Sequence, residues 1–296
     1  MGFTGLVRWT NAPSAAADLI RQNIIVNHQG VLRGRWQVVL SSWRSRFTGD
    51  SNDMRSLERP LYTVTMNDNT FVMLEDPGAP NRSDYLRLKE SQEQGQPPHP
   101  FVAAPPPHYH YTLVTVSPPG ALEQLMSHLG VVGKRWIRTG GEKGQGSGHH
   151  LNVDGLIFSI GSDWLVRFGH VMLGGGAVKG MLIEAEYLPL PDLHTEGGEG
   201  RSELLSDFLA SIIPILPDSE IWTVAVSDEM WAEVLAGFGE DDAGEEAESK
   251  MDEAEDDLFV SPEYLPATRK TDWLGANRDK RSAYLIQGAL KGEALI

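Results

Sequence analysis

Residues 155–189 read GLIFSIGSDWLVRFGHVMLGGGAVKGMLIEAEYLP. In the middle of this stretch, Trp164, Val166 and Phe168 alternate with Leu165 and Arg167. A similar alternation begins again at Met181. A period of two is typical of strands, because successive side chains of an extended chain point to opposite faces. The stretch therefore predicts consecutive, half-buried antiparallel strands rather than a helix.

Two short connections indicate that these strands form a β-meander. Residues 161–163, Gly-Ser-Asp, are short enough for a hairpin, and residues 174–176 are three glycines. Glycine adopts positive φ without steric cost, as tight turns require. The run LGGGAVKG differs from a phosphate-binding loop, because Lys179 precedes Gly180 and a strand is predicted to follow. We interpret it as a hairpin turn.

Helices are predicted where a capping residue precedes apolar residues of helical period. Ser14, Ser117 and Ser202 are such starting points. Gly130 and Pro214 are expected to end the second and third of these helices, since proline lacks the N–H that a helix needs. The second helix carries an apolar stripe made of Leu122, Leu125, Met126 and Leu129.

Further strands complete the sequence pattern. They are expected at 36–43, 61–66, 70–74, 109–116 and 132–138, with a short strand or helix lead-in at 221–226. A mixture of antiparallel strands and separate helices predicts an α+β fold.

Composition limits the kinds of partner. The 296 residues carry a formal net charge of −16, and residues 240–257 contain eleven Asp or Glu and one Lys. Contact with nucleic-acid phosphates needs clustered Lys and Arg, so we expect no direct binding of nucleic acid. The sequence has no cysteine and no apolar run of about 18 residues, and therefore predicts no disulfide, no thiolate nucleophile and no membrane span. We expect a soluble cytosolic or nuclear protein.

Two segments lack periodic patterns. Residues 75–107 are rich in Pro, Gln and Glu and offer little apolar surface to offset the entropy of ordering, so we predict a largely disordered insertion. Residues 239–262 form an acidic segment that we interpret as a solvated linker. Attraction of a basic partner surface and exclusion of nucleic acid by mimicry stay open for it. Beyond it, residues 272–290 predict a C-terminal helix.

The candidate metal ligands are two pairs of histidines, and the sequence predicts no further ligands that converge on either pair. His108 and His110 lie beside a proline-rich run, and His149 and His150 follow a glycine-rich one. A zinc or copper site also needs third and fourth ligands, and no cysteine is present. We therefore expect no metal site.

Carboxylate pairs do not predict an enzyme either. Glu184 and Glu186 share one face of a strand, and we interpret that face as solvated rather than as an acid/base pair. No nucleophile, base and orienting group come together in the pattern. We therefore expect no catalytic residue, no cofactor and no enzymatic activity.

The meander also carries a family resemblance. Residues 164–169 read WLVRFG and continue as HVMLG over 170–174, followed by Lys179-Gly180, LIEAEY over 182–187, and a helix with LL at 204–205 and DFL at 207–209. In that order these residues resemble subunit 20 of the Mediator complex, the transcription coactivator. The resemblance covers about 155–216, and the opening MGFTG and residues 61–66 are compatible with it.

This resemblance implies a fold and a role. The fold would be a single domain over 1–296, with a curved antiparallel sheet closing into an incomplete β-barrel and helices packed around it. The protein would be a nuclear scaffold subunit of the Mediator head module, paired with subunit 18, which has a related barrel, and associated with the C-terminal part of subunit 8. It would contact the other head subunits and help couple activators to RNA polymerase II, and the family has no catalytic residue to transfer.

Four residues are candidates for a partner interface. If Trp164 and the residues that share its face of the strands fill the barrel, Leu165 and Leu182 point outward. A helix of the same chain or a partner then covers them. Trp273 and Tyr284 are aromatic residues of the kind that dominate interfaces, or they pack on their own barrel. The alternative function is a stand-alone barrel that binds or hydrolyses a small molecule in its lumen.

Overall fold

A computed structural model of the chain describes residues 3–45, 58–93, 106–133, 136–139, 150–189, 202–214, 216, 219–224, 230, 233–234 and 276–291. Its strands are β1 (Phe3–Trp9), β2 (Val31–Ser45), β3 (Pro60–Met66), β4 (Asn69–Glu75), β5 (Tyr111–Val116), β6 (Trp136–Arg138), β7 (Leu151–Ile160), β8 (Trp164–Leu173), β9 (Val178–Tyr187) and β10 (Ile221–Val224). Its helices are α1 (Ala16–Asn27), α2 (Arg82–Glu93), α3 (Ala121–Gly133), α4 (Glu203–Ile212) and α7 (Ala276–Lys291). None of the helices in these ranges is long and apolar enough to cross a membrane.

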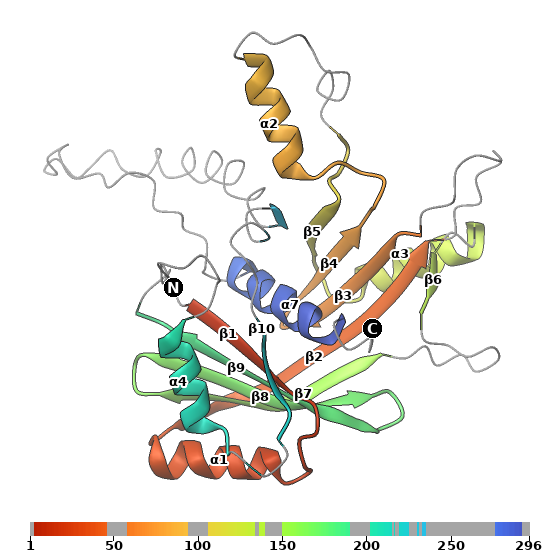
Figure 1. Ribbon diagram of the computed structural model, residues 1–296. Helices are drawn as coiled ribbons and strands as arrows, with labels where there is room; N and C mark the ends of the chain where they lie inside the picture. The colour runs from red at the N-terminus through yellow and green to blue at the C-terminus, as the bar shows by residue number, and fades with distance from the viewer. Residues whose placement is uncertain are drawn as a thin grey trace, which may run out of the picture.

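The strands form one curved antiparallel sheet (Figure 1). Its order is β10-β1-β9-β8-β7-β2-β3-β4-β5, with β6 paired to β2. Within the described ranges, β10 and β5 are the two edges and do not pair with each other, so the sheet is an incomplete barrel. The α+β fold with a curved, incompletely closed sheet is confirmed.

The predicted meander forms the centre of the sheet. β7, β8 and β9 pair in sequence order, and the turns between them contain Gly161 and Gly176 with φ of 59° and 85°. Positive φ is the conformation for which glycine was expected there. The 15-residue β2 is longer than predicted because it pairs with β7 and with β3, and so joins the meander to the other half of the sheet.

Helix α7 lies on the concave face of the sheet. It contacts β1 and β10 near one edge and β3 and β4 near the other, which is possible only where the sheet curves around it. Figure 1 shows α7 crossing the sheet between these two groups of strands. Its buried residues Leu285, Ile286 and Leu290 join a core with residues of at least six strands, among them Leu6, Leu182, Val153, Leu40, Val64 and Phe71.

Helices α1 and α4 cover the opposite, convex face. Ile20 and Ile24 of α1 and Leu205 and Leu209 of α4 pack on a second core of strand residues. This core includes Trp164, Val166, Phe168, Met181 and Ile183. These side chains were expected to fill the barrel, and that expectation is wrong: they lie under α1 and α4, and the other face of the same strands lines the concave side.

Three further details differ from expectation. Ser14 does not cap α1, because the helix follows Ala15 and has no side-chain cap bond, whereas Ser202 caps α4 by accepting from the Leu205 N–H. Helix α3 continues past Gly130 to Gly133. Helix α2 lies within the segment 75–107 that was predicted to be largely disordered, and residues 94–105 of it are outside the described ranges.

A long-range contact explains how α2 forms despite its polar sequence. The carboxylate of Glu233 accepts hydrogen bonds from the backbone N–H groups of Arg82 and Ser83 at the first turn of the helix. The first N–H groups of any helix lack partners within it, and a carboxylate there also interacts favourably with the helix dipole. The cap comes from about 150 positions later in the chain, so no local pattern predicts it.

Candidate functional site: the α7 contacts and the exposed apolar surface

A buried ion cluster joins α7 to the meander. On β9, Glu184 and Glu186 are 0% and 1% exposed, and they lie beside Arg167 on β8. The Arg167 guanidinium donates to Glu184 and lies 3.4 Å from a carboxylate oxygen of Glu186. The solvated face predicted for these two glutamates is therefore wrong, because α7 covers it.

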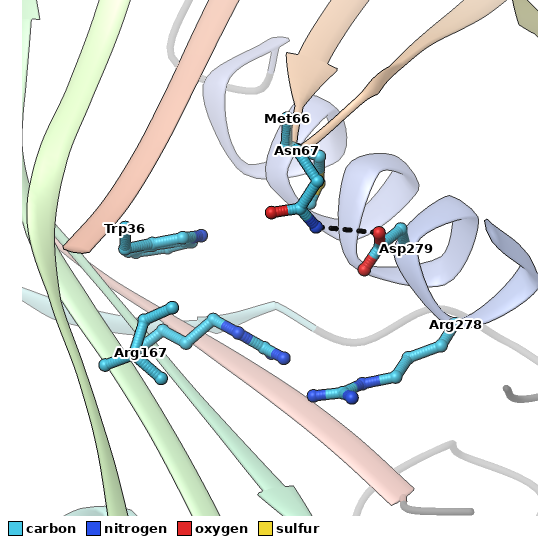
Figure 2. Close-up of a pocket in the computed structure, with 7 residues that line it drawn as sticks. Trp36, Met66, Asn67, Arg167, Arg278 and Asp279 are labelled. Atoms are coloured by element: carbon cyan, nitrogen blue, oxygen red, sulfur yellow. Dashed lines mark hydrogen bonds between the residues drawn. The ribbon is translucent and has the colours of Figure 1, made fainter. Parts of the chain in front are cut away.

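The first turns of α7 complete the cluster. Figure 2 shows Arg278 extending from this helix toward the side of the sheet where Arg167 lies. Arg278 lies with its Nη2 atom 2.5 Å from Glu186, and the Ser282 hydroxyl donates to Glu184. Burial alone would lower the pKa of Arg167, but the charges of Glu184 and Glu186 outweigh it and raise that pKa. Arg167 thus stays charged under the helix, and the contacts of Arg278 and Ser282 with the same two glutamates fix where α7 lies along the sheet.

The other end of α7 has its own polar contacts. The Lys291 ammonium lies 2.5 Å from Glu75 and 5.5 Å from the centre of the Tyr62 ring. Burial alone would lower the pKa of Lys291, but the hydrogen bond and the charge of Glu75 outweigh burial, and the pKa of Lys291 is raised overall. One end of the helix is therefore tied to β8 and β9, and the other to β3 and β4.

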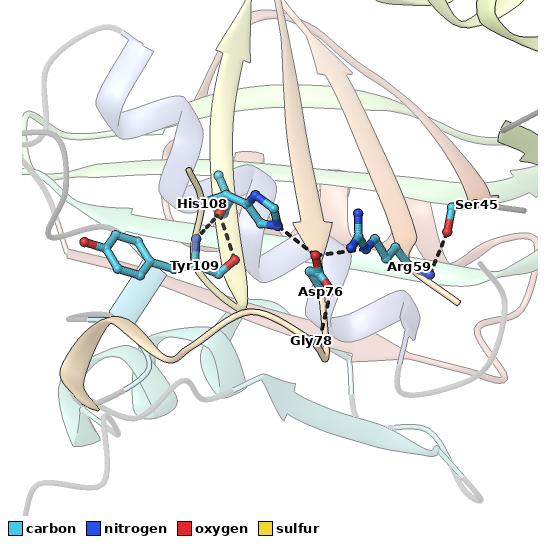
Figure 3. Close-up of polar contacts among 7 residues, drawn as sticks. Ser45, Arg59, Asp76, Gly78, His108 and Tyr109 are labelled. Atoms are coloured by element: carbon cyan, nitrogen blue, oxygen red, sulfur yellow. Dashed lines mark hydrogen bonds and ion pairs between the residues drawn. The ribbon is translucent and has the colours of Figure 1, made fainter. Parts of the chain in front are cut away.

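A second polar cluster connects the residues that follow β4 to the residues that precede β5 (Figure 3). Asp76, 2% exposed, accepts from His108 Nε2 at 2.7 Å and from the Gly78 N–H at 2.9 Å, and its carboxylate lies 2.9 Å from Arg59 Nε. Burial alone would raise the pKa of Asp76, but the hydrogen bonds from His108 and Gly78 and the charge of Arg59 lower it overall. This cluster gives His108 a structural role.

The other predicted metal-ligand candidates lie apart. His110 packs edge-on against Tyr111, and His150 lies beside Gly174 in the β8–β9 turn. His149 is outside the described residues. Within the described ranges, no group of three or more His, Cys, Asp or Glu side chains is arranged to hold a metal ion.

The four candidate interface residues have different surroundings. Leu182 is fully buried in the concave core, so a helix of the same chain covers it, and Leu165 is half-buried. Tyr284 packs partly against the same core, and burial raises its pKa to about 12. Trp273 lies outside the described residues. A contact between any of these residues and a partner stays a prediction.

The exposed apolar surface includes residues that the sequence patterns did not single out. Trp222, on the edge strand β10, is 64% exposed. The other large apolar side chains exposed in the described ranges are Leu19, Ile25, Val26, Val31, Leu32, Val39, Leu86, Val114, Leu125, Leu129, Val178 and Leu204. The signal that was available for Trp222 is its place in IWTV, a short apolar run with no clear alternation to show which side is covered.

Comparisons with known proteins add a family. A family model described as "TATA-binding related factor (TRF) of subunit 20 of Mediator complex" matches residues 1–259. No curated protein matches the sequence. Among solved structures, the PH1819 protein from Pyrococcus horikoshii OT3 is similar at 8% identity and a TM-score of 0.31, with 71% of this chain and 87% of that chain covered.

A second solved structure, the hypothetical protein NE1496, is similar at 9% identity and a TM-score of 0.27, with 79% of this chain and 95% of that chain covered. Neither structural similarity is high enough to carry an argument. The family match is different in kind, because it spans most of the 296 residues, including β1 to β10. The chain therefore belongs to the family of subunit 20 of the Mediator complex.

Proposed function

We propose that this chain, a Mediator subunit by family, is a non-enzymatic scaffold of the head module in the nucleus. It docks on the related barrel subunit 18, associates with the C-terminal part of subunit 8 and helps couple activators to RNA polymerase II. The observation that carries the proposal is the family match over residues 1–259. The geometry is compatible with it, because α7 fills the concave face with apolar side chains and α1 and α4 cover the convex face, whereas β10 is an edge strand within the described ranges.

The proposed docking surface lies along β10. Within the described ranges, this strand pairs with β1 alone, so its other edge presents unpaired backbone N–H and C=O groups. Trp222 stands out on it as a largely exposed aromatic residue, and tryptophan is enriched among the residues that dominate interface energies. An extended or edge segment of subunit 18 is the occupant that such an edge accommodates.

Co-expression tests the proposal. The full chain is produced alone and together with subunit 18 and the C-terminal part of subunit 8, and complexes are isolated through a tag on this chain. We expect the subunits to co-elute in size-exclusion chromatography and the yield of soluble chain to rise. Repeated absence of both partners from the isolated material would contradict docking in the head module.

Two variants locate the surface. Trp222→Ala should weaken binding of subunit 18 by about tenfold or more, as for a central interface tryptophan, with unfolding free energy changed by less than about 0.5 kcal/mol. Leu125→Ala is the control, because Leu125 is 54% exposed on α3. This helix packs on Leu61 of β3 and Val72 of β4, which lie several strands away from β10 in the sheet. If both variants bind subunit 18 equally well, the interface does not lie along β10.

A further inference from the structure

A cavity of about 210 Å³ lies between the sheet and the first turn of α7 (Figure 2). It is lined by Trp36, Met66, Asn67, Ile157, Arg167, Arg278 and Asp279. These residues come from β2, the end of β3 and the β3–β4 turn, β7, β8 and α7. One water occupies about 30 Å³ in the liquid, so the cavity has room for a group the size of a small side chain.

One lining residue has a buried donor without an acceptor. Trp36 is 4% exposed, and its indole Nε1–H has no hydrogen-bond partner. In Figure 2 the indole nitrogen points into the space between the sheet and α7, toward Asn67. The buried Nε of Arg278 likewise has no hydrogen-bond partner. A buried donor left unpaired costs about 1–3 kcal/mol, so these two N–H groups favour an acceptor in the cavity.

The charges around the cavity decide what kind of acceptor fits. Arg167 and Arg278 are already paired with Glu184 and Glu186, and Asp279 adds a further negative charge. Of these carboxylates only Asp279 lines the cavity, and it would repel an incoming carboxylate, since the charges of Arg167 and Arg278 are already balanced by Glu184 and Glu186. An incoming cation would lie against the two guanidinium groups, which also line the cavity. Burying an uncompensated charge is costly, so a neutral ligand is favoured.

An acceptor for a ligand N–H is present as well. The side-chain amide of Asn67 donates through Nδ2 to Asp279 at 2.8 Å, which orients the group. In Figure 2 its oxygen is turned away from Asp279 toward the cavity. The cavity therefore offers donors on Trp36 and Arg278 and an acceptor on Asn67, beside the apolar surfaces of Met66 and Ile157.

We propose that this cavity binds a neutral carboxamide group. The amide oxygen accepts from Trp36 Nε1, the amide NH₂ donates to the Asn67 oxygen, and the adjoining carbon atoms lie against Met66 and Ile157. The group is supplied by an Asn or Gln side chain of a partner protein or by a free small amide, which share this chemistry. The proposal rests on the cavity alone and does not depend on the Mediator assignment.

The indole N–H signal of Trp36 in a ¹H–¹⁵N spectrum of the full chain is the direct probe. Acetamide should shift this signal saturably, and acetate at the same concentration should not. The signal is assigned with Trp36→Phe, and the exposed Trp222 indole serves as an internal control for unspecific effects of the additive. No saturable shift with acetamide, or an equal shift with acetate, would overturn the proposal.

Asn67→Gly is a second test that does not depend on the Trp36 variant. Asn67 has a φ of 52°, which glycine adopts without strain, so the substitution removes the acceptor and keeps the turn. Loss of one hydrogen bond should weaken acetamide binding about fivefold. Unchanged acetamide affinity in this variant would contradict the assigned orientation of the amide and the proposal with it.

The two sources of the amide are separated in the complex with subunit 18. If a partner side chain fills the cavity, the Trp36 signal moves when the complex forms and no longer responds to acetamide. If the ligand is a free small amide, the signal still responds in the complex. Either result supports the carboxamide site and names its source.

Discussion

Ser282 on α7 donates a hydrogen bond to the carboxylate of Glu184 on β9, which lies 98 positions earlier in the chain. Both residues are buried, and the other oxygen of the same carboxylate accepts from Arg167. Glu184 therefore connects the centre of the meander to the helix that fills the concave face. Removing it affects both the charge balance and the position of α7.

Glu184→Ala should lower the free energy of unfolding by about 3 kcal/mol or more. The reason is that the buried charge of Arg167 keeps only its longer ion pair, with Glu186. Urea unfolding measures this. Glu58→Ala is the control, since Glu58 forms an ion pair with Arg44 at 3.4 Å in which both side chains are mostly exposed. Its cost should be about 0–1 kcal/mol. A similar, small cost for both variants would show that α7 does not bury the Glu184 cluster in solution.

Gly155→Ala should be strongly destabilising, because β7 and β8 approach each other closely at Gly155 and Gly169. A Cβ atom on Gly155 would lie 1.9 Å from the Phe168 carbonyl oxygen and 2.5 Å from the Gly169 Cα, so backbone would have to move. We expect a loss of about 3 kcal/mol or more, at the upper end for overpacking or beyond it.

Gly34→Ala is the matched control for this substitution. Gly34 lies in β2, directly next to β7, and a Cβ there would meet nothing within 4 Å. Its effect should be within about 1 kcal/mol and toward greater stability, since alanine restricts the unfolded chain. Thermal unfolding compares the two, and equal melting temperatures would contradict the close approach of β7 and β8.

The central meander was predictable because its signals are local. Alternating side chains and the glycines at the two turns act within a few residues, and the observed φ values of Gly161 and Gly176 match the requirement. The Ser202 cap is local as well. These elements follow from preferences of the chain that do not depend on distant segments.

The faces of the sheet were not predictable in the same way. Glu184 and Glu186 alternate with apolar residues as they would on an exposed face, and only α7, about 90 positions later, makes that face internal. Likewise the apolar stripe of α3 predicts one buried face, but Met126 is buried while Leu125 and Leu129 are exposed. Which side is covered depends on long-range packing, which the period of the sequence does not contain.

Acid should weaken the contact between β4 and β5 through Asp76. The pKa of Asp76 is lowered in the fold, so its ionised form contributes stability above the unfolded value of about 3.9, and this contribution is lost as pH falls through the folded pKa. Asp76→Asn removes the titration with little change in shape. We expect the variant to be less stable at neutral pH and the difference from the unmodified chain to shrink below about pH 4. Urea unfolding across pH measures it, and a pH-independent difference would contradict the role of the charge.

Leu290→Ala tests whether α7 is part of the core rather than a detachable cover. Leu290 is 0% exposed and packs with residues of the concave face, whereas Leu125 is 54% exposed on α3. Both are leucines in helices, so the same substitution has the same effect on helix propensity and differs in burial. Leu290→Ala should cost about 2–5 kcal/mol and Leu125→Ala about 1 kcal/mol or less. If the two variants unfold at the same urea concentration, α7 is undocked in solution, and the concave face, including Leu182, is then free for a partner.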